Sequence, residues 1–267
     1  MQEFGQDKER TFLLYILCLF VAALLIYFLL VRKETVLSLP EAEVEKVAQH
    51  LPDFSEYTVV RDRKEAFFAF LSPLAEKVNG EIKADRELLK QLQKVFRTRA
   101  QLSSRQRQEL ETLADKYRVE DYQALDVESI INTLQRRVAP IPKSLILAQA
   151  ANESAWGRSR FALEGNNLFG QWCFEPGCGL VPSDRPAGKR YEVAMFRAPI
   201  DSIRSYVMNL NTFSAYRELR EIRLQLQQQQ QPVTGTALAD GLINYSTRRE
   251  EYIAEIKLMI EQNHLEQ

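Results

Sequence analysis

The residues best suited to chemistry lie together in the segment Ala-Gln-Ala-Ala-Asn-Glu-Ser-Ala-Trp-Gly, positions 148–157. On a helix, Glu153 would share a face with Gln149 and Ala150, near the C-terminal end of that helix. A carboxyl group there loses hydration and feels the negative end of the helix dipole, and both effects favour its protonated form. A general acid needs that form near neutral pH. The open alternative is an exposed Glu on an ordinary amphipathic helix.

Aromatic and amide side chains around this segment suit carbohydrate. Trp156 follows Glu153 closely and can supply a stacking wall for a sugar ring. A polar and aromatic loop comes next, at positions 166–172, where amides can bond to hydroxyl groups and rings can stack. Taken alone, this loop is equally consistent with a capped turn around a buried Phe. The candidate substrate-binding residues are Gln149, Trp156, Asn166, Asn167, Phe169 and Trp172.

Other catalytic chemistries find little support. The chain has two histidines, His50 and His264, and neither accompanies a recognisable nucleophile motif or a set of metal ligands. We therefore expect no metal and no cofactor. Cys173 and Cys178 flank a Pro-Gly turn that would bring their thiols together, which predicts a disulfide if this part lies outside the cytoplasm. Half of a zinc site is the weaker alternative.

The order of residues through this region resembles a known family. Ile-Pro-Lys-Ser-Leu-Ile-Leu-Ala-Gln-Ala-Ala-Asn-Glu-Ser-Ala-Trp-Gly (141–157) is followed by Ser-Arg-Phe-Ala (159–162) and Gly-Asn-Asn-Leu-Phe-Gly (165–170). These motifs are similar to those of the bacterial glucosaminidase family of peptidoglycan hydrolases, and Gly-Gln-Trp-Cys and Gly-Leu-Ile-Asn-Tyr-Ser look like its Bax branch. The resemblance covers roughly residues 67–260. It implies a lysozyme-like α-lobe facing a small β-lobe across a sugar-binding cleft.

The resemblance also implies roles for single residues. Glu153 matches the family's acid, and a second carboxylate is expected from the β-lobe, with Glu192 as first choice and Asp184 as second. Tyr245 looks like the tyrosine that lines the family's cleft. The chain carries Ala155 where the family commonly has Gly, and a small residue should be tolerated on a helix.

These residues together predict hydrolysis of β-1,4 bonds at N-acetylglucosamine in peptidoglycan glycan strands. The water-activating step stays open, because a second carboxylate or the substrate's own acetamido group can assist. One alternative is a lytic transglycosylase, which would use a similar Glu-Ser pair. The other is an inactive peptidoglycan-binding or scaffold protein that kept the fold.

The elements that must position these residues are mainly helical. We expect a helix over residues 142–156, and a short strand over 191–196 within an irregular insertion. Upstream, apolar periodicity predicts a helix kinked by Pro73 and ended at Asn79-Gly80, and a second helix around residues 88–96. Further helices are expected after a capping box at Ser103-x-x-Gln106, after Asp126, and over residues 203–210, 238–243 and 250–264.

The N-terminal run Phe12–Val31 contains no charged residue. At about 1.5 Å per residue it matches the roughly 30 Å hydrocarbon core of a bilayer, which predicts a single-pass anchor. A buried core helix is the alternative, and basic residues on both flanks leave the orientation undecided. A peptidoglycan substrate would place residues 1–11 inside the cell and the catalytic domain in the periplasm, on the inner membrane.

The predicted organisation is therefore an anchor with a cytoplasmic stub (1–33), a stalk (34–61), a helical region (62–138) and a glucosaminidase domain (139–267). We expect the helical region to pack on the catalytic lobe, although a partner-docking surface is the alternative. The formal net charge of −1 and the lack of a Lys/Arg stripe give no reason to expect a nucleic-acid partner.

Overall fold

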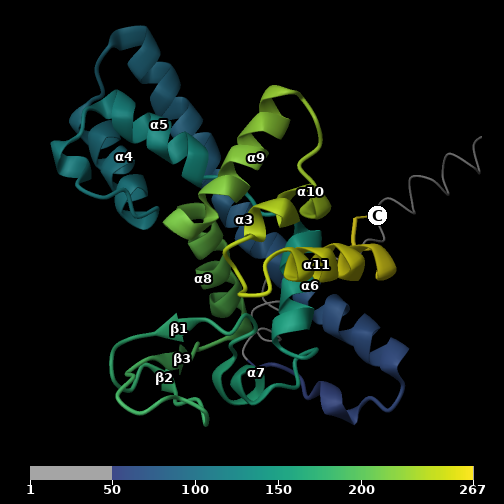
Figure 1. The fold of residues 1–267 in the computed structure, drawn as a ribbon. Helices are drawn as coiled ribbons and strands as arrows, with labels where there is room; N and C mark the ends of the chain where they lie inside the picture. Colours follow the sequence, from purple (N-terminus) through teal and green to yellow (C-terminus); the bar gives the residue numbers. More distant parts are fainter. Residues whose placement is uncertain (1–49, 267) are drawn as a thin grey trace, which may run out of the picture. The chain divides into compact units, whose positions relative to one another are not determined.

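A long helix, α3, and a buried helix, α6, organise the part of the chain that the structure describes, residues 50–266 (Figure 1). The structure is a computed structural model. It is mainly helical with one small sheet. The helices are α3 (Val60–Arg99), α4 (Ser104–Lys116), α5 (Val127–Arg137), α6 (Lys143–Glu153), α7 (Arg160–Gly165), α8 (Pro199–Thr212), α9 (Arg217–Gln228), α10 (Gly235–Ala239) and α11 (Glu250–Gln262). Short 3-10 turns are η1 (Phe54–Glu56), η2 (Tyr122–Ala124), η3 (Ser214–Tyr216) and η4 (Asp240–Leu242).

Helix α6 lies at the centre of the core. All its residues from Ser144 to Ala151 are buried, and α3, α10 and α11 pack against it. The small side chains Ala148, Ala150 and Ala151 allow several helices to approach it closely. This packing fixes the end of α6, and with it the position of Glu153.

The sheet contains three short strands, β1 (Trp172–Cys173), β2 (Gly179–Leu180) and β3 (Glu192–Ala194). The central strand β3 pairs antiparallel with both neighbours, in the order β1-β3-β2. Trp172 lies opposite Val193, and Gly179 lies opposite Ala194. Residue 179 must be small, because a Cβ there would lie 2.0 Å from the carbonyl oxygen of Val193.

Local sequence signals set several helix starts as expected. Ser103 and Gln106 form the predicted capping box at the start of α4. The side chain of Asp126 accepts a hydrogen bond from the Ser129 backbone N–H at 2.8 Å at the start of α5. The expected strand within 191–196 is also present, as β3.

Helix α3 is longer than the sequence predicts. It continues through Pro73 and Gly80 as one helix, so the predicted stop at Asn79-Gly80 is wrong. The side chain of Asn79 is buried and exchanges two hydrogen bonds with the backbone of Ile141, at 2.8 and 3.1 Å. Asn79 therefore serves a tertiary contact, while the apolar stripe of α3 continues on both sides of it.

The expected helix over residues 142–156 ends early, at Glu153. Ala155, Trp156 and Gly157 follow in the left-handed region, with φ of 52°, 62° and 74°. Ala155 therefore does not lie on a helix, contrary to expectation. Ser154 stabilises this turn, because its Oγ accepts a hydrogen bond from the Gly157 N–H at 2.7 Å.

The predicted anchor, residues 12–31, lies outside the described residues. Within residues 50–266, no helix combines the length and apolar character needed to span a bilayer. The described helices belong to one hydrophobic core, which includes Phe67 and Leu71 of α3, Ile146 of α6 and Tyr206 of α8.

Candidate active site

A cavity of about 430 Å³ opens at the C-terminal end of α6. Aromatic side chains form much of its wall, and Glu153 is the one acidic residue among the described residues that line it. The lining residues are Glu153, Phe169, Gly170, Gln171, Trp172, Phe174, Tyr206, Asn209, Leu210, Phe213, Tyr216 and Tyr245. A single carboxyl group among rings and amides is a suitable arrangement for proton transfer to a sugar.

Glu153 is the last residue of α6 and is half-buried. Its Oε1 accepts a hydrogen bond from the hydroxyl group of Tyr252 at 2.7 Å and a longer one from Nδ2 of Asn152 at 3.4 Å. Burial raises the pKa of Glu153, and the nearby Glu255 carboxylate adds to the rise. The two hydrogen bonds and Arg248 act in the opposite direction, but burial is the larger effect.

A chain of hydrogen bonds leads from the core to Glu153. Tyr206 donates to Oε1 of Gln149, and Nε2 of Gln149 donates to the Tyr252 hydroxyl oxygen at 2.7 Å. Because Tyr252 accepts from Gln149, its own proton is directed at Glu153. These hydrogen bonds all point the same way, from Tyr206 through Gln149 and Tyr252 to Oε1 of Glu153. Oε2 of Glu153 has no hydrogen-bond partner among the described residues.

These hydrogen bonds change the role expected for Gln149. The sequence suggested that Gln149 binds substrate, but its side chain is fully buried and bonded at both ends. It positions Tyr252 instead. Sequence reasoning did not single out Tyr252, because on α11 it follows the apolar periodicity of an ordinary core residue.

Tyr245 lies beside Glu153 without bonding to it. It lines the cavity, and its ring stacks on Tyr252 with centroids 5.2 Å apart. Its hydroxyl group donates to the Phe169 carbonyl oxygen at 3.2 Å. Tyr245 therefore lies in the wall of this cavity, whereas the tyrosine bonded to Glu153 is Tyr252.

The loop before β1 divides between wall and support. Phe169 and Trp172 line the cavity: Phe169 stacks on Tyr206 at 3.9 Å between centroids, and Trp172 is 59% exposed. Asn167 is 1% exposed, and its side chain bonds to four backbone groups of the loop and β3. Asn166 ends α7 and donates to the Phe196 carbonyl oxygen at 3.1 Å. Neither Asn is among the lining residues, so the geometry gives them a structural role.

Comparison with known proteins bears directly on this region. Residues 127–265, which include Glu153, the whole cavity wall and Tyr252, match the family profile Glucosaminidase, described as mannosyl-glycoprotein endo-beta-N-acetylglucosaminidase. The chain belongs to the glucosaminidase family. This glucosaminidase-family chain is also 35% identical over 213 residues to protein bax of Escherichia coli (strain K12), covering 80% of its own length and 74% of the relative. It is therefore a Bax-like member of the family.

Among solved structures, the glucosaminidase-family chain is similar to the catalytic domain of the autolysin Auto from Listeria monocytogenes. The two share 16% identity with a TM-score of 0.38, over 87% of this chain and 98% of that chain. At that level of similarity, nothing about the present fold follows from the autolysin.

Trp156 does not line the cavity of the glucosaminidase-family chain. Its ring packs edge-on against Phe67 and Phe68 of α3, at 5.7 and 5.3 Å between centroids, and Nζ of Lys64 lies over it. The left-handed turn after α6 directs Trp156 towards α3. Its contacts indicate a packing role rather than the predicted sugar wall.

The structure does not bring the predicted second carboxylate to Glu153. Both oxygens of Glu192 accept backbone N–H groups, from Gly177 at 3.1 Å and Gly179 at 2.8 Å, and these bonds lower its pKa. Asp184 is exposed, and neither acid is among the lining residues of the cavity. The physical reason is that Glu192 lies on the central strand, where its carboxylate holds the turn between β1 and β2.

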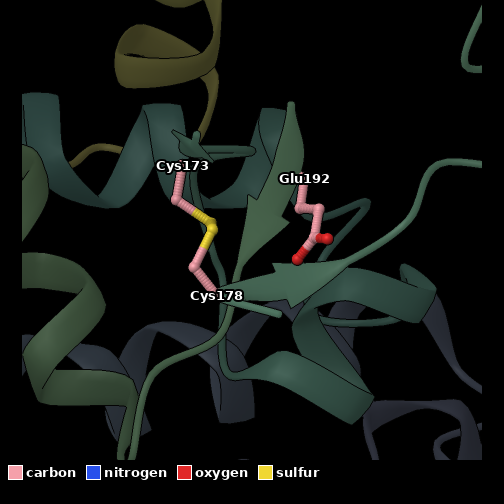
Figure 2. A group of neighbouring side chains, drawn as sticks. All are labelled: Cys173, Cys178 and Glu192. Carbon is pink, nitrogen blue, oxygen red and sulfur yellow. A yellow bond between two sulfur atoms is a disulfide. The ribbon is translucent and has the colours of Figure 1, made fainter. Parts of the chain in front are cut away.

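The same turn carries a disulfide between Cys173 and Cys178, whose Cα atoms lie 6.2 Å apart. Figure 2 shows the disulfide and Glu192 side by side on the small sheet. Two sulfur atoms joined to each other are not thiolates, so these three residues do not form a metal site in this state. The disulfide and the Glu192 hydrogen bonds together hold the segment that presents Phe174 to the cavity.

Proposed function

We propose that this chain is a peptidoglycan hydrolase that cleaves β-1,4 glycosidic bonds at N-acetylglucosamine, with Glu153 as the general acid. The observation that carries the proposal is a buried carboxyl group of raised pKa in a cavity walled by aromatic rings. The raised pKa keeps a proton available, and the rings of Trp172 and Tyr216 can stack on sugar faces. Membership of the glucosaminidase family agrees with this chemistry.

The hydrogen bonds at Glu153 suggest which oxygen transfers the proton. Tyr252 donates to Oε1, so the acid's own proton resides on Oε2, which has no partner among the described residues. In the first step Oε2 gives this proton to the departing glycosidic oxygen as the bond to C1 breaks. Glu153 is then a carboxylate, and Tyr252 stabilises it.

Glu153 is the one acid that the described residues bring to the cavity, and this favours assistance from the substrate. The 2-acetamido oxygen of N-acetylglucosamine can attack C1 as the leaving group departs, forming a cyclic oxazolinium ion. Glu153 then accepts a proton from water, which attacks C1 and reopens the ring. This sequence returns Glu153 to its protonated form and requires no second carboxylate.

The same observation also favours one other reaction. In a lytic transglycosylase the single acid protonates the leaving group, and the substrate's own C6 hydroxyl replaces water. The product would be a 1,6-anhydromuramyl end, whereas the proposed hydrolysis gives a reducing N-acetylglucosamine end.

We further propose that residues 12–31 anchor the chain in the bacterial inner membrane and that residues 139–267 act in the periplasm, as a lysozyme-like α-lobe facing a small β-lobe. A substrate outside the cytoplasm supports this location. The Cys173–Cys178 disulfide supports it too, because such bonds persist mainly in oxidising compartments. The helical region 62–138 shares the core with α6 and α8, which supports a packing role for it.

The test is digestion of purified peptidoglycan by the full chain, followed by mass spectrometry of the soluble fragments. Wild type should release fragments with reducing N-acetylglucosamine ends, and Glu153→Gln should release none. Glu164→Gln is the matched control, since it makes the same change at a half-exposed acid outside the cavity. Lysis by Glu153→Gln would refute the assignment. Binding without fragments from wild type would instead support a scaffold protein.

A further inference from the structure

Helices α5 and α9 pack against each other (Figure 1). Residues of these two helices line a second cavity, of about 270 Å³. Residues on one face of each helix line it, since spacings of three and four place side chains on the same side. The lining residues are Asn132, Thr133, Arg136, Arg137, Arg217, Arg220 and Glu221. We call this set the basic cavity, because it combines four guanidinium groups with one carboxylate.

The charges of the basic cavity are not balanced by other residues that the structure describes. Glu221 pairs with Arg136 at 2.5 Å. Arg217 is exposed and has no hydrogen bond or ion pair with any described residue. The remaining two arginines bond only to backbone carbonyls here, so an excess of positive charge faces the cavity.

Arg220 gives the strongest indication of an anion site, because this residue is only 8% exposed and yet carries a charge. Its Nη1 donates to the carbonyl oxygens of Leu210 and Phe213, at 3.0 and 2.8 Å. Its Nε and Nη2 have no partner among the described residues, and neither is a fully buried atom. These donors therefore meet solvent through the cavity that Arg220 lines.

Electrostatics within the cluster agrees with this geometry. Burial lowers the pKa of Arg220 to about 10, and repulsion from Arg137 and Arg217 adds to the effect. Arg220 stays charged at neutral pH. A bound anion would offset the repulsion and supply the acceptor that the free donors lack.

Residues that line the basic cavity and the candidate active site are neighbours along the chain. Tyr216 lines the first cavity and the next residue, Arg217, lines the second. Arg118 bridges them as well: its guanidinium lies 4.8 Å from the ring centroid of Phe213, which lines the first cavity, and Arg137 donates to its carbonyl oxygen.

We propose that the basic cavity binds free carboxylates of the peptide stems carried by the glycan strand. This inference rests on the proposed function, because peptidoglycan bears peptides with free carboxylates beside its sugars. Planar guanidinium groups match carboxylates with paired hydrogen bonds, and the side-chain amide of Asn132 adds a neutral donor at the same wall. The cavity would select strands with intact stems and hold them across the active site.

The test is co-sedimentation of the full-length Glu153→Gln chain with insoluble peptidoglycan, so that the readout does not depend on cutting. Two polymers are compared: native peptidoglycan, and the same material with its carboxyl groups converted to amides. Arg217→Gln should weaken binding to the native polymer about threefold to fivefold, as expected for one partly exposed charge pair. Asn132→Asp should act in the same direction, because it adds a negative charge to the cavity without removing an arginine.

The amidated polymer should bind about equally to the parent chain and to both variants. Arg97→Gln is the matched control, since it removes another exposed arginine, from α3 and outside both cavity linings, and it should change nothing. Equal loss on both polymers, loss on neither, or no binding at all would overturn the inference. If the wild-type chain cuts peptidoglycan but Arg217→Gln does not weaken binding, the proposed function holds and the inference about the basic cavity is wrong. Arg217-dependent binding by a chain that never cuts would refute the chemistry but support the cavity.

Discussion

Replacing Tyr252 by Phe tests how the acid is tuned. The Tyr252 hydroxyl donates to Oε1 of Glu153 at 2.7 Å, and this bond favours the ionised carboxylate. Removing it should raise the pKa of Glu153 further above its usual range. In the proposed mechanism the protonated acid is the active form, so activity is lost as pH rises through that pKa. The variant should therefore stay active to higher pH than wild type.

The size of the effect follows from the strength of the lost bond. A hydrogen bond to a charged group contributes about 1.5–3 kcal/mol. Glu153 lines an open cavity, where water can replace part of the interaction, so the lower end of that range applies. One pKa unit corresponds to about 1.4 kcal/mol. The pH at which activity falls on the alkaline side of the pH–activity profile should therefore rise by about one unit.

The assay is the pH dependence of kcat/KM for release of soluble fragments from peptidoglycan, whose alkaline limb reports the acid of the free enzyme. Tyr245→Phe is the matched control, because Tyr245 lies in the same cavity but bonds to the Phe169 carbonyl instead of Glu153. The rate of Tyr245→Phe can fall, but the alkaline limb of its pH profile should lie at the same pH as in wild type. A limb that stays fixed or moves to lower pH in Tyr252→Phe would refute the reasoning.

Three further predictions concern single side chains. Glu153→Gln should raise the Tm at neutral pH. Burial raises the pKa of Glu153 in the folded protein, so ionisation of this carboxyl group destabilises the fold above the unfolded-state pKa. The gain in Tm should vanish in acid, where Glu153 is protonated in both the folded and the unfolded protein. Glu192→Gln should lower the Tm, because it weakens the turn that the carboxylate holds. Its kcat should fall by less than the roughly hundredfold expected when a catalytic carboxylate is removed. A larger loss of kcat without unfolding would restore the predicted catalytic role of Glu192. Ala155→Gly should stabilise the fold by about 0.5–1 kcal/mol, or roughly 2 °C in Tm, because residue 155 has a φ of 52° that glycine adopts without strain; a lower Tm would show that the turn is not strained.

Signals that act over a few residues were predictable from the sequence. The capping box at Ser103 and the cap at Asp126 are local hydrogen bonds between near neighbours, and both are present. The position of Glu153 at a helix end, beside small side chains, is also local. It indicated a carboxyl group with a raised pKa before any tertiary contact was considered.

The partners of these residues were decided only by tertiary structure. Tyr252 lies 99 positions from the acid it contacts, and Tyr206 lies 57 positions from Gln149. Periodicity reports that such side chains face a core, but not which buried polar group they meet there. The same limit explains Trp156, which the turn after α6 directs to α3, and Glu192, whose carboxylate bonds to backbone N–H groups of a neighbouring turn.

The sequence by itself therefore determined the family and the mainly helical class, and it singled out Glu153 as the candidate acid, because motifs, periodicity and capping are written in consecutive residues. Tertiary structure alone decided which residues surround that acid. Packing of α11 against α6 brings Tyr252 to the buried Gln149, and Tyr206 of α8 bonds to the same glutamine. A polar group taken out of water bonds to whatever partner the fold provides. The direction of the hydrogen bonds at Glu153, and the basic cavity between α5 and α9, exist only in that assembled core.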